Sequence, residues 1–265
     1  MKTSLNSVLW LICIFAGLCT ARAEEPLRLR VLSYNIHHAE GVDRKLDVPR
    51  IAEVMLSVKP DVIAVQEVDR KVKRSRGEDQ PAELARLTKM HAAFGENIEL
   101  QGGHYGNLLL SRFPIIRHKN HLLPNIDKSE QRGVIAAELQ IAEGKPPLLF
   151  YATHFDFRSD ERERLASVKM INELAAAHAD QPALLAGDLN ATPESKTLLD
   201  LAAAWTQAND KPLPTIPVEK PSKQIDFILY RPSERWKVIE VRVLNEAIAS
   251  DHRAIFAELE MLPAQ

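Results

Sequence analysis

Side chains of the kinds that bind metal ions and phosphate recur where apolar runs of this chain end. The run that starts at Leu27 ends in Asn35, and the run from Asp61 to Val68 carries Glu67 near its end. Later runs repeat the pattern, and the recurring polar residues are Asn35, Glu67, His154, Asp188, Asn190, Asp226, Asp251 and His252. Strand ends at one rim of a sheet structure converge in space. We therefore expect these side chains to form one cleft.

The residue types favour a hard-metal phosphate site. Mg²⁺ takes few protein oxygens and leaves positions for water and substrate phosphate. The carboxylate of Glu67 and the carbonyl oxygen of Asn35 are ligands of that kind. The chain has no GxxxxGK[ST] loop, no GxSxG motif and no pair of histidines at the i, i+4 spacing of a zinc helix. A P-loop nucleotide site, a serine hydrolase and a closed structural zinc site therefore find no support.

The elements that must position these groups alternate between strand and helix in the first half of the chain. Nine segments have the apolar character of strands: 27–36, 61–68, 106–116, 133–141, 147–155, 182–190, 224–230, 236–244 and 253–261. Helical periodicity predicts helices over 47–60, 81–90 and 159–179, and Asp47 suits the N-cap of the first. This count predicts an α/β fold with two packed sheets and helices outside them.

The first 23 residues have the features of a signal peptide. Lys2 precedes the apolar stretch Val8–Leu18, which is short for a membrane span, and Ala21–Ala23 give a small-x-small site before Glu24. The predicted organisation is a signal peptide over 1–23 and one domain over 24–265, exported to the periplasm or the medium. A retained anchor is the alternative, and after cleavage we expect no integral membrane segment.

Net charge and cysteine content limit which molecules the chain is expected to bind and which chemistry it is expected to perform. The formal charge is −2, and removing the first 23 residues, which carry Lys2 and Arg22 but no acid, makes it −4. No basic excess favours tight non-specific binding to nucleic acid. Both cysteines, Cys13 and Cys19, lie in the predicted signal peptide, so the predicted mature chain has neither disulfides nor thiolate chemistry. We expect a monomer.

An ordered set of motifs resembles the endonuclease/exonuclease/phosphatase family, which has the deoxyribonuclease-I-like fold. The motifs are SYNI, QEV, GNLLLSRFPI, ATHFD, AGDLNATP, QIDFIL and SDHRAIF. QEV alone is weak, but GDLNATP together with SDH is specific, and the resemblance covers nearly all of the predicted mature chain. Within the family the sequence is most similar to compact bacterial metal-dependent hydrolases. The resemblance implies a four-layer α-β-β-α sandwich of two packed mixed β-sheets and a Mg²⁺ or Mn²⁺ cofactor.

The resemblance also implies roles for the recurring polar residues. Glu67 matches the main metal ligand, Asn35 lies beside it, and Asp251 is an acid that reaches a metal directly or through water. Asp188 matches the residue that positions or deprotonates the attacking water. The remaining matches are His154 at the scissile phosphate, Asn190 next to Asp188 or the phosphate, and Asp226 as the hydrogen-bond partner of His252.

The chemistry of phosphoryl transfer is consistent with these roles. That reaction needs charge neutralisation and an in-line water more than a covalent nucleophile. A free histidine titrates near pH ~6.5, and an adjacent carboxylate favours its charged form. With Asp226 as its partner, His252 would carry a proton that stabilises the transition state or assists the leaving oxygen.

Five further positions leave two interpretations open. Arg132 and Arg74 either meet a substrate phosphate or are exposed loop side chains, and Asn107 either reaches the phosphate or satisfies a turn. His37 and His38 directly follow the first predicted strand, where they are either cleft residues or rim histidines in a loop. Arg132 and Asn107 are the predicted substrate-binding residues.

The predicted function is an exported metal-dependent hydrolase of phosphate esters that uses an activated water. The chain lacks a basic arm and a basic groove interleaved with aromatic residues, so a secreted nuclease acting on DNA or RNA is the alternative rather than the first choice. A binding module that has lost catalysis is a third possibility. Because all eight recurring polar residues are present, that reading is disfavoured.

Overall fold

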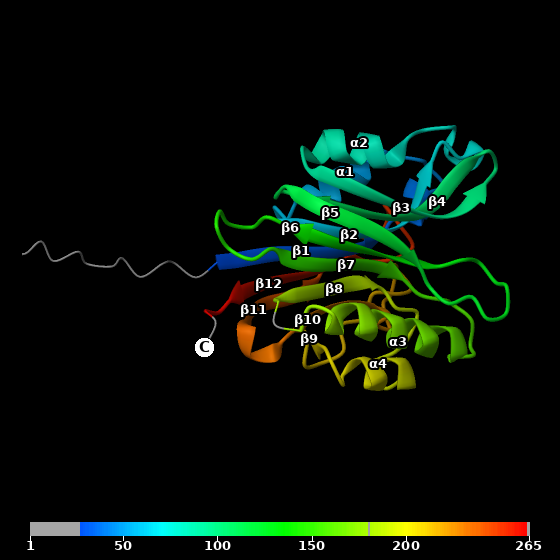
Figure 1. Cartoon of the computed structure of the whole chain (residues 1–265). Coiled ribbons are helices and arrows are strands. Elements are labelled where there is room, and N and C mark those ends of the chain that lie inside the picture. The colour runs from blue at the N-terminus through cyan, green and yellow to red at the C-terminus, as the bar shows by residue number, and fades with distance from the viewer. Residues whose placement is uncertain (1–26, 180, 264–265) are drawn as a thin grey trace, which may run out of the picture.

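A computed structural model describes residues 27–179 and 181–263 (Figure 1). The predicted signal peptide lies outside the described residues. Two six-stranded sheets pack face to face, and each mixes parallel with antiparallel neighbours. The first sheet has the order β11 (Trp236–Val243), β12 (Ile255–Met261), β1 (Leu27–Asn35), β2 (Val62–Arg70), β4 (Gly103–Ser111) and β3 (His91–Leu100). The second has the order β5 (Ile115–Leu122), β6 (Gly133–Leu139), β7 (Leu148–His154), β8 (Ala183–Asp188), β10 (Asp226–Arg231) and β9 (Thr206–Gln207).

Helices cover the outer faces of both sheets. In Figure 1, α1 (Val48–Leu56) and α2 (Gln80–Thr88) lie beyond the first sheet, whereas α3 (Arg162–Ala176) and α4 (Lys196–Leu201) lie beyond the second. The predicted four-layer α-β-β-α sandwich of two packed mixed sheets is therefore confirmed. Within the described part of the chain, no helix is both long and apolar enough to cross a bilayer.

Helix α1 forms for the reasons its sequence suggests. The Asp47 carboxylate accepts a hydrogen bond from the Arg50 backbone N–H at 2.9 Å, and Pro49 occupies the first turn. Ile51 and Met55, one turn apart on the same face, are fully buried beneath the first sheet. The helix therefore anchors the segment that follows β1.

Residues that face the other sheet are apolar at one end of the strands and polar at the other. In β1 this face passes from Leu29 and Val31 to Asn35, and in β8 it passes from Leu184 to Asp188. The apolar members belong to one core cluster between the sheets. Because side chains alternate along a strand, the polar residues point into the same interlayer space as that core. The site therefore lies between the sheets at one rim.

Three strands and one helix were not expected from the sequence. The predicted strand 106–116 is two strands, since β4 ends at Ser111 and β5 starts at Ile115 after a turn containing Pro114. Strand β3 lies at a sheet edge with many exposed side chains, so its apolar pattern is weak. The short elements β9 and α4 were also missed.

Candidate active site

A cleft of about 320 Å³ opens at the polar rim of the two sheets. It combines acidic, basic and aromatic side chains contributed by both sheets and their loops. The residues that line it are Glu67, Arg74, Ile98, Leu100, Tyr105, Glu130, Arg132, His154, Phe157, Asp188, Asn190 and His252. Six of these were predicted as site residues from the sequence: Glu67, Arg132, His154, Asp188, Asn190 and His252.

A β-bulge directs Glu67 into the cleft. Pairing between β2 and β4 shifts between Val65 and Val68, so Gln66 and Glu67 together lie opposite Asn107. Glu67 adopts φ = 60°, which is uncommon for a residue other than glycine. Bulges of this kind redirect a side chain near active sites. Glu67 therefore leaves the regular alternation of β2 and reaches the cleft.

Asn35 joins the carboxylates of the two sheets. Its Nδ2 donates to Glu67 Oε1 at 3.0 Å and to Asp188 Oδ2 at 3.1 Å. Its Oδ1 accepts a hydrogen bond from the His37 backbone N–H at 3.1 Å. The Asn35 amide thus orients both carboxylates through its nitrogen. Ligation of a metal through its carbonyl oxygen stays a prediction.

Asp188 lies at the centre of the polar residues. His154 and Asp226 are its register partners in the adjacent strands β7 and β10. The His154 and His252 Nε2 atoms are 3.4 and 3.8 Å from Asp188 Oδ2. Burial favours the protonated acid, but His154, His252 and the Asn190 backbone N–H outweigh it and hold the pKa of Asp188 below its usual range. The carboxylate is therefore ionised at neutral pH.

His154 is held between Arg132 and Asp188. Arg132 Nη1 lies 3.0 Å from His154 Nδ1, and a guanidinium can only donate, so Nδ1 is the acceptor. The proton of the neutral ring is then on Nε2, facing Asp188. Asn190 Nδ2 donates to the Phe155 carbonyl at 3.0 Å, and the Asn190 backbone N–H, in a left-handed conformation with φ = 46°, donates to Asp188 Oδ1 at 2.9 Å. Asn190 thus holds Asp188 in place beside His154.

His252 and Asp226 form the buried pair expected from the resemblance. His252 Nδ1 lies 2.9 Å from Asp226 Oδ2, and both residues are buried. Burial disfavours the imidazolium, but the carboxylate and its hydrogen bond prevail and raise the pKa of His252 to about 10. Burial raises the pKa of Asp226, although His252 opposes that shift. His252 is therefore a cation at neutral pH, with Nε2 toward the cleft.

The turn before β12 separates Asp251 from His252. Ser250 Oγ donates to the Asn35 carbonyl at 2.7 Å and accepts from the His252 backbone N–H at 3.2 Å. Asp251 is exposed and is not among the residues that line the cleft. The structure thus brings His252 into the site and leaves Asp251 at its edge, where a metal role stays a prediction.

The two predicted substrate-binding residues occupy different places. Arg132 is buried in the cleft wall and forms an ion pair with Glu130 at 2.7 Å. Asn107 lies in the middle of β4 rather than at the start of a strand, because β4 already begins at Gly103. Its Nδ2 donates across the sandwich to the Gly133 carbonyl at 2.8 Å, and it does not line the cleft. Contact with a substrate stays a prediction for both residues.

Sequence reasoning left out several residues of the cleft wall. Tyr105 is buried, and burial together with Glu67 raises its pKa well above the ordinary value, which keeps its hydroxyl protonated. Arg74, for which two interpretations were open, is an exposed residue whose side chain donates two hydrogen bonds of 2.9 Å each to Asp69. Phe157 is 65% exposed at the rim, near the Arg132 guanidinium. The one sequence feature that could have identified Tyr105 as a cleft residue is its position directly before the predicted strand 106–116.

The donor set of the cleft fits a hard divalent cation. Glu67 and Asp188 bring two carboxylates from opposite sheets, and the Asn35 amide touches one oxygen of each. Within the described ranges, the other carboxylate oxygen of Glu67 accepts no hydrogen bond, and Glu67 lines the cleft. Carboxylate and amide oxygens are the ligands that Mg²⁺ and Mn²⁺ accept. The carboxylates of Glu67 and Asp188 are thus able to hold such an ion, and Asn35, whose Oδ1 accepts from the His37 backbone N–H, orients them.

Comparisons with known proteins agree with this geometry. The model of the Endonuclease/Exonuclease/phosphatase family matches residues 32–252. The uncharacterized protein YbhP of Escherichia coli K12 is 27% identical over 251 residues, which cover 89% of this chain and 98% of YbhP.

Solved structures share the fold. The endonuclease/exonuclease/phosphatase from Beutenbergia cavernae superposes with a TM-score of 0.77 at 25% identity, covering 88% of this chain and 72% of that one. The mannosyl-6-phosphatase Bt3783 of Bacteroides thetaiotaomicron superposes with a TM-score of 0.73 at 18% identity, covering 87% and 99% of the two chains. The second likeness, at that identity, concerns the fold alone.

Proposed function

Because this chain belongs to the endonuclease/exonuclease/phosphatase family, we propose that it hydrolyses phosphate esters with the aid of a divalent metal ion, Mg²⁺ or Mn²⁺. One observation carries the proposal. Carboxylates and cations meet in a single cleft between the two sheets: Glu67 and Asp188 come from opposite sheets, and Arg132 and His252 lie around them together with His154. This is the arrangement that a reacting phosphate requires.

The side chains have separable tasks. A bound divalent cation would supply electrophilic stabilisation of the phosphate charge. The Arg132 guanidinium and the His252 imidazolium add fixed positive charge to the cleft. The ionised Asp188 accepts a hydrogen bond from the attacking water, and Asn190 and His154 hold that carboxylate in place.

His252 also has a proton to give. Asp226 holds its Nδ1, which leaves Nε2 as the atom that faces Asp188 and the cleft. A charged imidazole at this position donates a hydrogen bond to a phosphate oxygen or a proton to the leaving oxygen. General acid help of this type contributes roughly 10²–10⁴-fold.

A substrate panel with purified protein tests the activity. It compares bis-p-nitrophenyl phosphate, p-nitrophenyl phosphate, inositol phosphates, sphingomyelin and plasmid DNA, each with Mg²⁺ or Mn²⁺ and with EDTA. We expect turnover that EDTA abolishes and that Asp188→Asn and His252→Gln each lower by about 10²–10⁴-fold in kcat. His118→Gln, which alters an exposed histidine on β5, serves as the matched control.

The panel also separates the alternatives. Cleavage of plasmid DNA at lower enzyme concentration than any small phosphoester would favour the nuclease. Absence of EDTA-sensitive turnover on every substrate would favour a binding module of the same fold and would overturn the proposal.

We further propose that residues 1–23 direct export and are removed. The support is the positively charged start, the short apolar stretch and the small residues Ala21 and Ala23 before Glu24. Fractionation of expressing cells, with N-terminal sequencing of the mature protein, checks this. A cytoplasmic protein that retains its first 23 residues would contradict it.

A further inference from the structure

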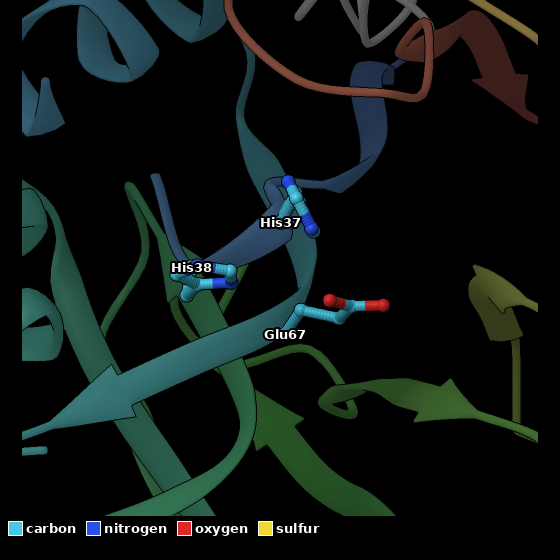
Figure 2. A group of neighbouring side chains, drawn as sticks. All are labelled: His37, His38 and Glu67. Carbon is cyan, nitrogen blue, oxygen red and sulfur yellow. The ribbon is translucent and has the colours of Figure 1, made fainter. Parts of the chain in front are cut away.

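Two adjacent histidines and Glu67 lie together beside the cleft. One ligand atom from each of His37, His38 and Glu67 falls within 4.8 Å of the others. Figure 2 shows the three side chains grouped where the chain that leaves β1 passes β2. The histidines come from the turn after β1, and Glu67 comes from the bulge in β2. Neither histidine belongs to the hydrolytic machinery proposed above.

An unusual backbone brings the two rings together. His37, His38 and Ala39 have φ values of 46°, 43° and 62°, three left-handed residues in succession. The turn is held in place because His38 O accepts from Gln80 Nε2 at 2.7 Å and Ala39 O accepts from the Asp47 backbone N–H at 2.9 Å. Adjacent side chains of an extended strand would point in opposite directions. Here the ring centroids are 4.5 Å apart.

The tautomer of His37 leaves a nitrogen available for a ligand. Its Nδ1 lies 3.0 Å from the Glu40 carbonyl oxygen, which can only accept, so Nδ1 carries the proton. The lone pair of the neutral ring is then on Nε2. Metal-binding histidines commonly fix their tautomer by donating the other ring N–H to a backbone carbonyl.

His38 presents a buried nitrogen without a partner. The residue is 9% exposed, and its Nδ1 has no hydrogen-bond partner among the residues that the structure describes. Its other nitrogen, Nε2, lies 3.9 Å from Glu40 Oε2. A histidine that serves only the core would have its polar atoms satisfied. His38 thus lies in a turn and does not line the cleft, as the loop interpretation expected, but its ring is buried.

The local charge favours a cation. Glu40 and Glu67 are near the two rings, and Asp69 and Arg74 lie close behind them. Arg74 donates two hydrogen bonds to Asp69, so these two charges balance each other. Glu40 also lies 3.8 Å from the exposed Arg44 guanidinium, which solvent screens, so the carboxylates of Glu67 and, in part, Glu40 remain to balance a divalent ion.

We propose that His37, His38 and Glu67 bind a divalent first-row transition metal, and that Glu67 is shared between this ion and the hard cation of the cleft. Two imidazoles and one carboxylate are a ligand set for Zn²⁺, Co²⁺ or Mn²⁺ and leave further positions open for water. Mg²⁺ prefers oxygen ligands, so it does not compete well here. The ion would lie next to the phosphate-binding cleft on the side of β1.

Cobalt titration of the full chain without substrate tests the site. Co²⁺ bound to imidazole nitrogen has a visible absorption spectrum distinct from that of the hydrated ion. Millimolar Mg²⁺ is added so that it, rather than Co²⁺, occupies the hard-cation site of the cleft. His37→Asn and His38→Asn remove one imidazole each, and asparagine tolerates the left-handed backbone. We expect each variant to weaken Co²⁺ binding by more than the roughly 10–100-fold that loss of an outer-shell partner costs.

Controls and a second readout keep the result decisive. His118→Asn, an exposed histidine of β5, should bind Co²⁺ like the unaltered chain. Pulsed electron paramagnetic resonance of Mn²⁺ on the unaltered chain should show coupling to imidazole ¹⁴N, which needs no variant to fold. Equal Co²⁺ affinity in all four proteins, or Mn²⁺ without nitrogen coupling, would overturn the site. Because turnover is not measured, failure of the proposed hydrolysis would be recognised separately.

Discussion

The His252–Asp226 pair should make the stability of this protein depend on pH in a defined direction. Asp226 raises the pKa of His252 to about 10 in the folded chain, whereas an unfolded histidine titrates near pH ~6.5. Because the folded pKa is the higher one, the stabilisation is fully present below pH ~6.5 and is lost as the pH rises toward 10. Asp226→Asn removes the carboxylate that causes the shift.

The size of the effect follows from linkage. Each pH unit between the two pKa values changes the free energy of unfolding by at most about 1.4 kcal/mol for one proton. Over three pH units this gives at most about 4 kcal/mol, and we expect roughly 2–4 kcal/mol because the slope is smaller close to either pKa than midway between them. The destabilisation caused by Asp226→Asn should therefore shrink by that amount between pH 6.5 and pH 9.5.

Urea unfolding in EDTA, followed by the fluorescence of the buried Trp205 and Trp236, measures this difference. Asp210→Asn makes the same change of charge at an exposed position and should show no such pH dependence. A constant difference between the unaltered chain and Asp226→Asn across this range would refute the assignment of the charged pair.

Three further substitutions test other parts of the structure. Arg132→Gln removes the hydrogen-bond donor to His154 Nδ1. In steady-state assays it should raise KM and lower kcat/KM by at least about 10-fold. Unchanged kinetic constants would contradict the position of Arg132 in the cleft. Gly187→Ala would place a methyl group against the Thr153 carbonyl oxygen, so a lower melting temperature and weaker activity are expected, and a neutral result would be inconsistent with this close approach. Asp47→Ala removes the cap of α1 and should cost about 1 kcal/mol in denaturant unfolding without changing kcat; no loss would show that the cap contributes little.

Much of the architecture could be predicted because it depends on local pattern. The apolar runs of β1, β2, β7 and β8 are buried on both faces, so their strand character is clear from composition alone. Edge strand β3 and the short β9 depend on neighbours for their stability, and their own residues carry a weak signal. Pattern thus identifies the middle of each sheet better than its edges.

The candidate site was predictable where it follows strand ends and not where it depends on irregular backbone. Asp188 and His154 terminate regular strands and become register partners. The bulge at Glu67 and the three consecutive left-handed residues His37–Ala39 require positive φ, which is uncommon for residues other than glycine even though histidine adopts it more often than most. No local preference favours these conformations, because they are imposed by tertiary contacts such as the Gln80 hydrogen bond to His38 O.

The side chains of the cleft come together only when the strands pair in their native register. Val31 to Asn35 pair in parallel with Val62 to Gln66, and His154 pairs with Asp188 in the other sheet. A strand shifted by one residue would turn its polar end away from the interlayer space. Misaligned collapsed chains would still bury much apolar surface, yet they would lack a convergent set of metal ligands. Recovery of metal affinity during refolding would therefore follow strand alignment, whereas tryptophan fluorescence would follow collapse.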